Sequence, residues 1–287
     1  MNILGKETTQ TVADNATALQ AGGNITITNG LSIEDVTRLF DILFKNQFPI
    51  IQEVAKEQAI INKREFEKIV IQDLHNNAKN IIIEKFQDPD IQALLNDAIT
   101  SAARKGKKSH PELLSKIIVE KVSDGGSDLL DIILTEAVEV IPKITKEQIA
   151  LICALFILRD VKVKKMVGNV FYKLEDLHGR YDRYFGVDFK LSMTNIKHVI
   201  YVGACNYSEN HAIDAETVYV DKYNKFDVGS YDEAAKMLKV LTPVTSRFIE
   251  HVQYLSRSGL VLTSVGQAIA IAALKQIDDF EYSTWLK

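Results

Sequence analysis

Apolar residues recur every three or four positions along most of this 287-residue chain, which is the spacing of an amphipathic α-helix. The longest such pattern covers residues 49–86 and forms one apolar stripe about ten turns long. Pro49 suits the first turn of a helix, and Asp88-Pro89 ends the pattern because the residue before a proline avoids the α region. The pattern predicts one long helix, or a helical hairpin that breaks near Asn62, whose apolar stripe must be covered by another surface.

Shorter helices are expected between turn-forming residues. They cover residues 91–104, 111–122, 128–141, 146–166, 170–184, 231–241, 244–255 and 265–277. Thr145, followed three residues later by Gln148, has the spacing of a capping box, which marks a helix start. The two most apolar segments, 149–158 and 260–274, are shorter than the roughly 20 residues that cross a bilayer. We therefore expect them to be buried core helices, and we expect no membrane association.

Strand-like segments are few and short. Residues 198–204 and 216–223 have β-branched and aromatic composition, and residues 259–263 form a short apolar run. Near the N-terminus, Ile25 and Ile27 alternate with polar residues. These patterns predict a mainly α fold, with a multi-helix N-terminal block and a smaller α/β C-terminal region. The expected domains are a flexible arm with a short strand (1–31), an all-helical domain (32–186) and a smaller α/β region with a helical C-terminus (187–287).

Composition favours the helical prediction and limits the partners. The chain has 14 glycines and 5 prolines, about 7% of its residues against about 12% in average proteins, and turn-rich β folds use both heavily. The formal net charge is −4, so no overall positive field attracts nucleic acid. The cysteines, Cys153 and Cys205, are too few for the disulfide framework of a secreted domain, and the first residues lack the apolar run of a secretory signal. We expect a cytoplasmic protein.

The sequence lacks the short motifs of nucleotide binding, zinc hydrolysis and α/β-hydrolase catalysis, so we expect neither a cofactor nor a metal. Arg104 and His110 have the spacing with which HEPN-type helical ribonucleases supply a phosphate-binding guanidinium and a general base. This spacing often arises by chance, and both residues flank a Lys-Gly-Lys-Lys run that is typical of a solvated connection. The solvated connection is the favoured interpretation.

Two other segments combine reactive side chains. The polar segment after residues 198–204 carries Cys205 and His211, which together have the composition of a nucleophile and its base. Residues 178–184 are rich in aromatic and basic groups, which stack on bases and bind phosphate in RNA-binding proteins. An ordinary polar loop and an ion-paired helix end are the commoner outcomes, and we favour them.

The C-terminal segment resembles a winged-helix unit over about fifty residues. A helix is followed by a Gly-Leu-Val strand and by Leu-Thr-x-x-Gly at the position of the wing. The resemblance implies that the helix presents Arg247, His251 and Arg257 to phosphates or base edges. Winged-helix units also bind proteins, and nearby acids weaken the attraction to DNA, so nucleic-acid binding is an alternative function.

The run Gly22–Val36 (GGNITITNGLSIEDV), together with HVIYVGAC and GLVLTSVGQAIAIAALKQ, resembles an uncharacterised bacterial family of similar length. Members of that family open with a comparable GNITITNGLS segment. The resemblance implies a bacterial, cytoplasmic protein and carries no activity, catalytic residue or ligand. Such openings also resemble those of some multi-domain bacterial defence and signalling proteins, which implies a role in phage defence or stress response.

Together, these patterns favour a helical interaction protein without an assigned catalytic activity. We expect a homo-oligomer, or binding of a protein partner, through residues 49–86. Nucleic-acid binding through the winged-helix-like unit and a HEPN-like ribonuclease activity are the alternatives.

Overall fold

The computed structural model describes residues 48–123, 126–163, 170–186, 191–223, 226, 228–278, 280–282 and 286. The chain divides into two compact units, residues 1–55 and residues 56–287. Only residues 48–55 of the first unit are described, and they form the start of a helix that continues into the second unit. The arm expected over 1–31, with its short strand at Ile25–Ile27, lies outside the described residues.

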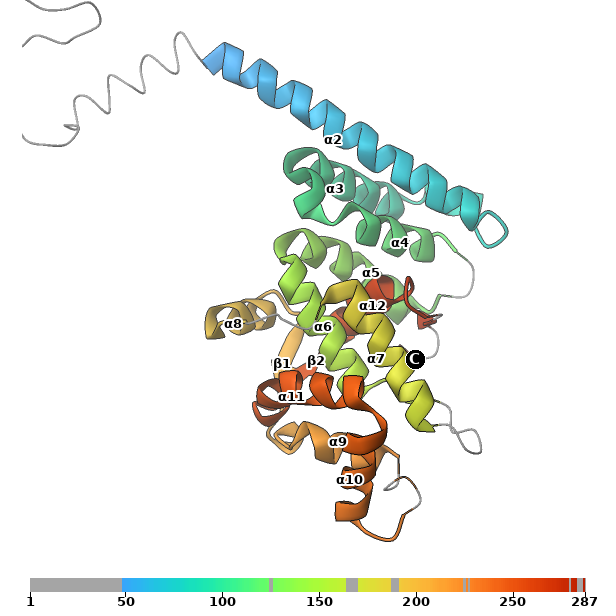
Figure 1. The fold of residues 1–287 in the computed structure, drawn as a ribbon. Helices are drawn as coiled ribbons and strands as arrows, with labels where there is room; N and C mark the ends of the chain where they lie inside the picture. The colour runs from blue at the N-terminus through green and yellow to red at the C-terminus, as the bar shows by residue number, and fades with distance from the viewer. Residues whose placement is uncertain are drawn as a thin grey trace, which may run out of the picture. The chain divides into compact units, whose positions relative to one another are not determined.

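The described part of the chain is mainly α, as predicted, with eleven α-helices and one small two-stranded sheet (Figure 1). The helices are α2 (Phe48–Asn76), α3 (Pro89–Lys105), α4 (Pro111–Lys121), α5 (Asp128–Val140), α6 (Lys146–Arg159), α7 (Val170–Phe185), α8 (Met193–Tyr201), α9 (Ala215–Lys222), α10 (Tyr231–Leu241), α11 (Pro243–Arg257) and α12 (Ser264–Leu274). The strands are β1 (Cys205–Tyr207) and β2 (Leu260–Leu262), and short 3₁₀ helices include η2 (Ile83–Gln87), η3 (Gly106–Ser109) and η5 (Glu209–His211).

Two helices form the centre of the second unit. Every residue of α6 from Gln148 to Leu158 is buried, and α12 is buried from Val265 to Leu274 except for Gln267. Helices that are apolar on all sides belong in a core, and α12 packs along α6 and α5. The expectation of buried core helices is confirmed for residues 149–158 and 265–274, whereas residues 260–262 form β2. One buried cluster extends from Phe66 to Leu286, on both sides of residue 186; the domain division near that residue stays a prediction.

Local signals account for several helix starts. The capping box predicted at the start of α6 is present: the Thr145 hydroxyl accepts from the Gln148 backbone N–H, and the Gln148 side chain accepts from the Thr145 N–H. The start of α11 is capped by a residue that is distant in sequence. The Glu175 carboxylate, on α7, accepts from the backbone N–H groups of Val244 and Thr245. Negative charge at a helix N-terminus is favourable, so Glu175 ties α7 to α11.

Two of the predicted strands are helices. Residues 198–204 form the end of α8 and the turn after it, and residues 216–223 fall almost entirely within α9. In α8 the buried residues are Ile196 and Val199, three positions apart, and in α9 they include Ala215 and Tyr219, four positions apart. Burial along one helical face outweighs the strand preference of β-branched and aromatic residues, which depends strongly on context.

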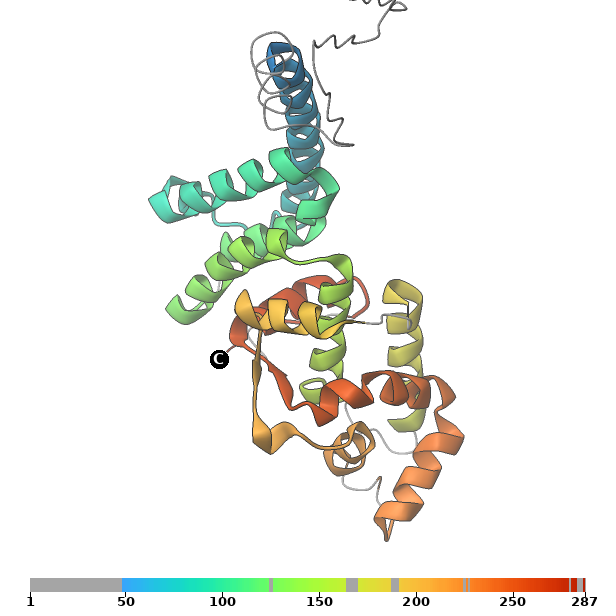
Figure 2. The ribbon, with the colours of Figure 1, turned by 90° about the vertical axis from the view of Figure 1, so that its left-hand side faces the viewer.

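The sheet joins segments far apart in sequence. β1 pairs antiparallel with β2, with Cys205 opposite Leu262 and Tyr207 opposite Leu260. The strand predicted over 259–263 is therefore confirmed as β2. Figure 2 shows these two extended segments side by side among the helices of the unit. Each strand has three residues. The sheet therefore links the chain before α9 to the chain before α12 but forms no separate layer of the fold.

The prediction of a wing after β2 is wrong. Thr263 is the N-cap of α12, where its hydroxyl accepts from the Gly266 N–H at 3.1 Å. Gly266 lies in the first turn of that helix, and a β-carbon there would lie 2.0 Å from the carbonyl oxygen of Ala204. The glycine therefore permits close packing of α12 on the chain before β1 and does not form a hairpin tip.

The longest predicted helix is shorter than expected and unbroken. α2 continues through Asn62, so it is one helix and no hairpin, and it ends at Asn76. Beyond it, Ile81 forms an isolated bridge with Ser123, and the Ile82 N–H donates to the Val122 carbonyl at 2.9 Å. The end of the stripe predicted over 49–86 therefore packs against the end of α4 in extended and 3₁₀ conformation.

Lys121 joins three helices from a buried position. Its side chain is 1% exposed, and its Nζ donates to Asp90 (2.7 Å), to Asp131 (2.7 Å) and to the Thr135 hydroxyl (2.6 Å). We expect Lys121→Met to lower the free energy of unfolding by about 2 kcal/mol, because these bonds are lost while both half-exposed carboxylates regain water. Urea unfolding measures this change. Lys108→Met, at an exposed lysine, is the control and should change stability little; equal stability of both variants would contradict the assigned role.

Candidate functional site

One side of α2 packs on the rest of the second unit. Phe66 is 2% exposed and belongs to the core cluster. Asn62 Nδ2 donates to the Ala103 carbonyl at 3.0 Å, and the Ser115 hydroxyl donates to Asp73 Oδ2 at 2.6 Å. These contacts fix which face of the helix points inward.

Another side of α2 is open and partly apolar. Ile60 is 41% exposed and Ile71 is 59% exposed, and the exposed residues Arg64 and Glu67 lie between them. At 3.6 residues per turn these four side chains lie within about 60° of one another and about 130° from Phe66. We call Ile60, Arg64, Glu67 and Ile71 the α2 seam. Their spacings of four, three and four residues are those of the a and d positions of a coiled coil.

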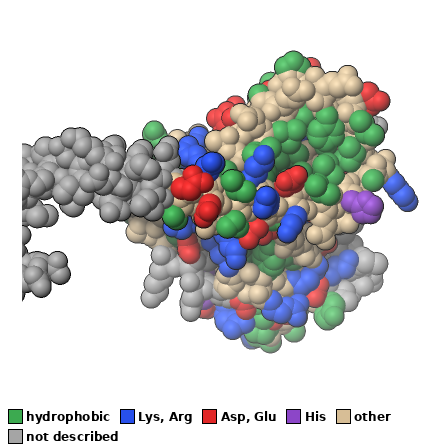
Figure 3. Space-filling view, turned by 90° about the horizontal axis from the view of Figure 1, so that it is seen from above, with side chains coloured by type: hydrophobic (Ala, Val, Ile, Leu, Met, Phe, Trp, Pro, Cys, Tyr) green, Lys and Arg blue, Asp and Glu red, His purple; other side chains and the backbone are tan. Residues whose placement is uncertain are grey.

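The charges of the α2 seam have no partner within the described residues. Neither Arg64 nor Glu67 forms an ion pair or a hydrogen bond to another described side chain. The view from above in Figure 3 shows acidic, basic and hydrophobic side chains mixed on the face that α2 crosses, with a larger group of hydrophobic side chains beside them. An exposed seam of this kind is typical of a helix that pairs with another helix.

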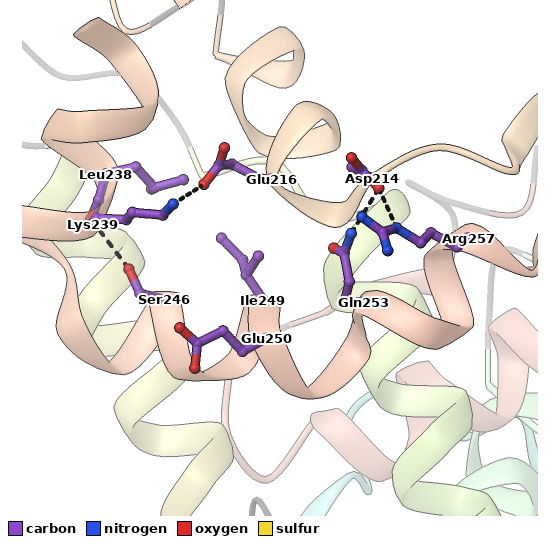
Figure 4. A pocket seen from close by; sticks show the side chains of 9 residues that line it. All are labelled: Asp214, Glu216, Leu238, Lys239, Ser246, Ile249, Glu250, Gln253 and Arg257. Carbon is purple, nitrogen blue, oxygen red and sulfur yellow. Dashed lines mark hydrogen bonds and ion pairs between the residues drawn. The ribbon is translucent and has the colours of Figure 1, made fainter. Parts of the chain in front are cut away.

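A second candidate is a cavity of about 370 Å³ between α9, α10 and α11 (Figure 4). Ile249 and Leu238 contribute apolar side chains to its lining. At one side Lys239 pairs with Glu216 at 3.1 Å. Glu250 also lines the cavity and forms no ion pair with another described residue. The carboxylates at this cavity outnumber the cations, so it does not favour a phosphate.

The three residues predicted to bind nucleic acid all lie on α11, and acids neutralise two of them. Arg257 Nε donates to Asp214 Oδ1 at 2.5 Å, and Arg247 lies 3.7 Å from an Asp182 carboxylate oxygen. His251 Nδ1 pairs with the Arg247 carbonyl at 2.7 Å, one turn earlier. The structure therefore brings these residues onto one helix, where paired acids reduce the positive charge that phosphate binding requires.

Asp214 also organises the start of α9. Gln253 Nε2 donates to Asp214 Oδ1 at 2.7 Å, while Gln253 Oε1 accepts from the Ala215 N–H at 3.0 Å. The pKa of Asp214 is lowered, chiefly by its hydrogen bond to Arg257. Arg257 thus belongs to a network that holds α9 against α11.

A third candidate is a cavity of about 560 Å³ lined by the end of α6, by η5 and the turn after it, by α9 and by β2. Lys222 is its most buried charged group. Its Nζ donates to the carbonyls of Leu158 (2.6 Å) and Val161 (2.9 Å), at the C-terminal end of α6. Arg159 donates to the carbonyls of Leu260 (3.0 Å) and His211 (2.9 Å). Cations at a helix C-terminus satisfy its free carbonyls.

Burial shifts the titration of the groups at this cavity. It lowers the pKa of Lys222 to about 7, an effect that the nearby Asp160 carboxylate opposes. Burial also raises the pKa of Asp160, which accepts a hydrogen bond from Gln267 Nε2 at 3.0 Å. Shifted pKa values mark many catalytic sites. Here the donors of Lys222 and Arg159 are used on backbone carbonyls, so the cluster serves the fold and we assign it no reaction.

Arg104 and His110 lie at opposite ends of η3. Arg104 is exposed in the last turn of α3, and His110 precedes α4 with a positive φ of 54°. His110 Nε2 pairs with the Ile144 carbonyl at 2.8 Å. No hydrogen bond joins Arg104 to His110 within the described residues. The histidine connects η3 to the segment before α6, and the ribonuclease hypothesis stays a prediction.

The segment that contains Cys205 and His211 and the aromatic and basic segment 178–184 both make structural contacts. Cys205 is buried in β1, and burial raises its pKa to about 12, so the thiol stays protonated near neutral pH. His211 pairs through Nδ1 with the Ser208 hydroxyl at 2.8 Å. Tyr181, in the aromatic and basic segment, is buried and donates to the Ala150 carbonyl at 2.8 Å. Arg180 pairs with Asp176 and Asp278, as expected of an ion-paired helix end.

Sequence reasoning missed the buried cations and the α2 seam. Lys121 and Lys222 occupy ordinary positions on predicted elements, and only the fold shows that they are buried. The spacing of Ile60 and Ile71 was readable from the sequence. The longer stripe dominates the sequence pattern, and the structure buries that stripe at Phe66.

None of the helices that the structure describes is long and apolar enough to cross a membrane. Among the described residues, no three histidine, cysteine or acidic side chains gather closely enough to hold a metal ion.

Fold and surface together define a mainly helical protein with an exposed, coiled-coil-like seam on its first described helix. A protein-family model described as “:-like” matches residues 30–256, and the chain belongs to that family. The match covers about four-fifths of the chain and begins at Gly30, so most of the GNITITNGLS segment precedes it. No curated protein and no solved structure matches the chain.

Proposed function

We propose that the protein is a helical interaction protein that self-associates through the exposed face of α2. The α2 seam carries this proposal, because two isoleucines, 41% and 59% exposed, flank unpaired charges at coiled-coil spacing. Covering them removes apolar surface from water, which contributes about 25 cal/mol per Å². The proposal narrows the interaction segment expected over 49–86 to residues 60–71.

The nucleic-acid and ribonuclease alternatives have weaker support. Arg247 and Arg257 already pair with carboxylates, and His110 pairs with a backbone carbonyl. A bacterial, cytoplasmic role in phage defence or stress response is compatible with self-association, and we retain it as part of the proposal.

The experiment compares the mass of variants in solution. Static light scattering at about 100 µM is expected to give a dimer for the wild type, since a short seam supports a dissociation constant in the micromolar range. Ile60→Asp with Ile71→Asp is expected to give a monomer, because association would then bury carboxylates in place of the apolar side chains of the seam.

Ile83→Asp is the matched control. Ile83 is 74% exposed on η2, outside the seam, so this variant should remain a dimer. A monomeric wild type, or loss of the dimer in the control with retention in the seam variant, would overturn the proposal. Circular dichroism of each variant checks that the helices are intact.

A further inference from the structure

The α2 seam has an internal symmetry that fixes how two copies would pair. Its order is apolar, basic, acidic, apolar, at positions 60, 64, 67 and 71. The midpoint between residues 60 and 71 along the helix is also the midpoint between residues 64 and 67. A two-fold axis perpendicular to the helix, midway between residues 65 and 66, therefore exchanges the two isoleucines and exchanges arginine with glutamate.

We propose that α2 pairs with α2 of a second copy in antiparallel orientation about this axis. The inference rests on the proposed self-association and deepens it by naming orientation and register. Ile60 of one copy then packs against the partner's Ile71, and Arg64 lies beside the partner's Glu67. In antiparallel coiled coils a positions face d positions, which is the arrangement that this register produces.

Charge decides between the two orientations. A parallel, in-register pair would place Arg64 beside the partner's Arg64 and Glu67 beside the partner's Glu67. Like charges in a low-dielectric interface are unfavourable, while the antiparallel register forms two opposite-charge pairs. Because both residues lack an ion pair within the described part of the chain, the partner's charges would not displace existing ones. Polar pairs at seam positions set register and orientation more than stability.

The free cysteines allow a direct test in the full chain. Cys153 and Cys205 are buried, so new cysteines on the α2 seam will react selectively. In the antiparallel register, Ile60→Cys in one chain lies opposite Ile71→Cys in the other. Two copies of residue 60 would instead lie about 16 Å apart along the helix, far beyond the span of a disulfide.

The Ile60→Cys and Ile71→Cys proteins, one of which carries a size tag, are oxidised with copper phenanthroline in three samples. Two samples contain one protein each, and the third contains both proteins mixed before oxidation. We expect a disulfide-linked dimer of tagged and untagged chains in the mixture and little linkage in either protein alone. Efficient linkage of each protein with itself would indicate parallel pairing and overturn the inference. Absence of linkage in proteins that light scattering shows to be dimers would also overturn it.

A charge exchange provides the second test. Arg64→Glu and Glu67→Arg are each expected to weaken the dimer at least about tenfold, and the double variant should recover most of that loss. Glu65→Arg, at an exposed position outside the seam, is the matched control and should change the dissociation constant little. Failure of the double variant to recover would overturn the antiparallel register alone. A monomeric wild type would overturn the proposed function itself, so the two failures are distinguishable.

Discussion

Gly266→Ala is expected to lower the free energy of unfolding by about 4 kcal/mol or more. The added β-carbon would lie 2.0 Å from the Ala204 carbonyl oxygen and 3.1 Å from its carbon. Backbone atoms cannot move aside as a flexible side chain can, so α12 or the chain before β1 must shift within a close-packed core. The same shift would strain the 3.2 Å hydrogen bond from the Thr263 N–H to that carbonyl.

Gly179→Ala is the control for this prediction. Gly179 lies inside α7, and a β-carbon there meets nothing within 4 Å. The control should leave stability unchanged or raise it by up to about 1 kcal/mol, because alanine favours helix. Chemical denaturation of both variants measures the difference. A Gly266→Ala protein as stable as the wild type would show that α12 does not pack against Ala204 this closely.

Acid is expected to destabilise the protein through His178. The ring is fully buried, and its pKa is lowered to about 3, chiefly by burial and to a smaller extent by the charge of Lys222. The unfolded chain has an ordinary histidine pKa near 6.5. The unfolded state therefore binds more protons between these values, so stability is complete above about pH 6.5 and falls as the pH drops toward 3. Linkage gives a loss of about 3 kcal/mol at pH 4.5 from this residue.

A double variant isolates this contribution. His178 pairs through Nε2 with the Tyr219 hydroxyl at 2.7 Å and contacts the ring of Phe248, which is tilted by 35° with ring centroids 4.4 Å apart. His178→Phe with Tyr219→Phe removes both polar groups together, so neither remains buried without a partner. Tyr219→Phe alone is the control that keeps the histidine. Between pH 7 and pH 4.5 the double variant should lose about 3 kcal/mol less than the control; equal losses would refute the role of His178.

The helical elements could largely be predicted, whereas two of the three strands expected within the described residues belong to α8 and α9. α10 has the bounds that its sequence pattern indicates, and the capping box at Thr145 marks the start of α6 correctly. The segment HVIYVGA appeared to be a strand because β-branched residues are common in strands. The buried pair Ile196 and Val199 shows instead that packing on one helical face determines its structure. The strand preference of β-branched residues is less than about 1 kcal/mol per residue, so burial of apolar side chains on one helical face outweighs it.

The candidate site was partly visible in the sequence. The long apolar stripe correctly indicated a long helix, and burial of Phe66 shows that part of this stripe is covered by the chain itself. Which apolar residues remain exposed depends on the fold, so the distinction between Phe66 and Ile71 was not available from spacing alone. The ion pairs of Arg247 and Arg257 also depend on residues distant in sequence, which a motif search does not include.

Sedimentation equilibrium of the unmodified full chain is the most direct measurement of self-association. Between about 1 µM and about 200 µM the account predicts a weight-average mass that rises from 32.2 kDa toward twice that value. The data should fit one monomer–dimer equilibrium. A mass of 32.2 kDa at every concentration would contradict the account.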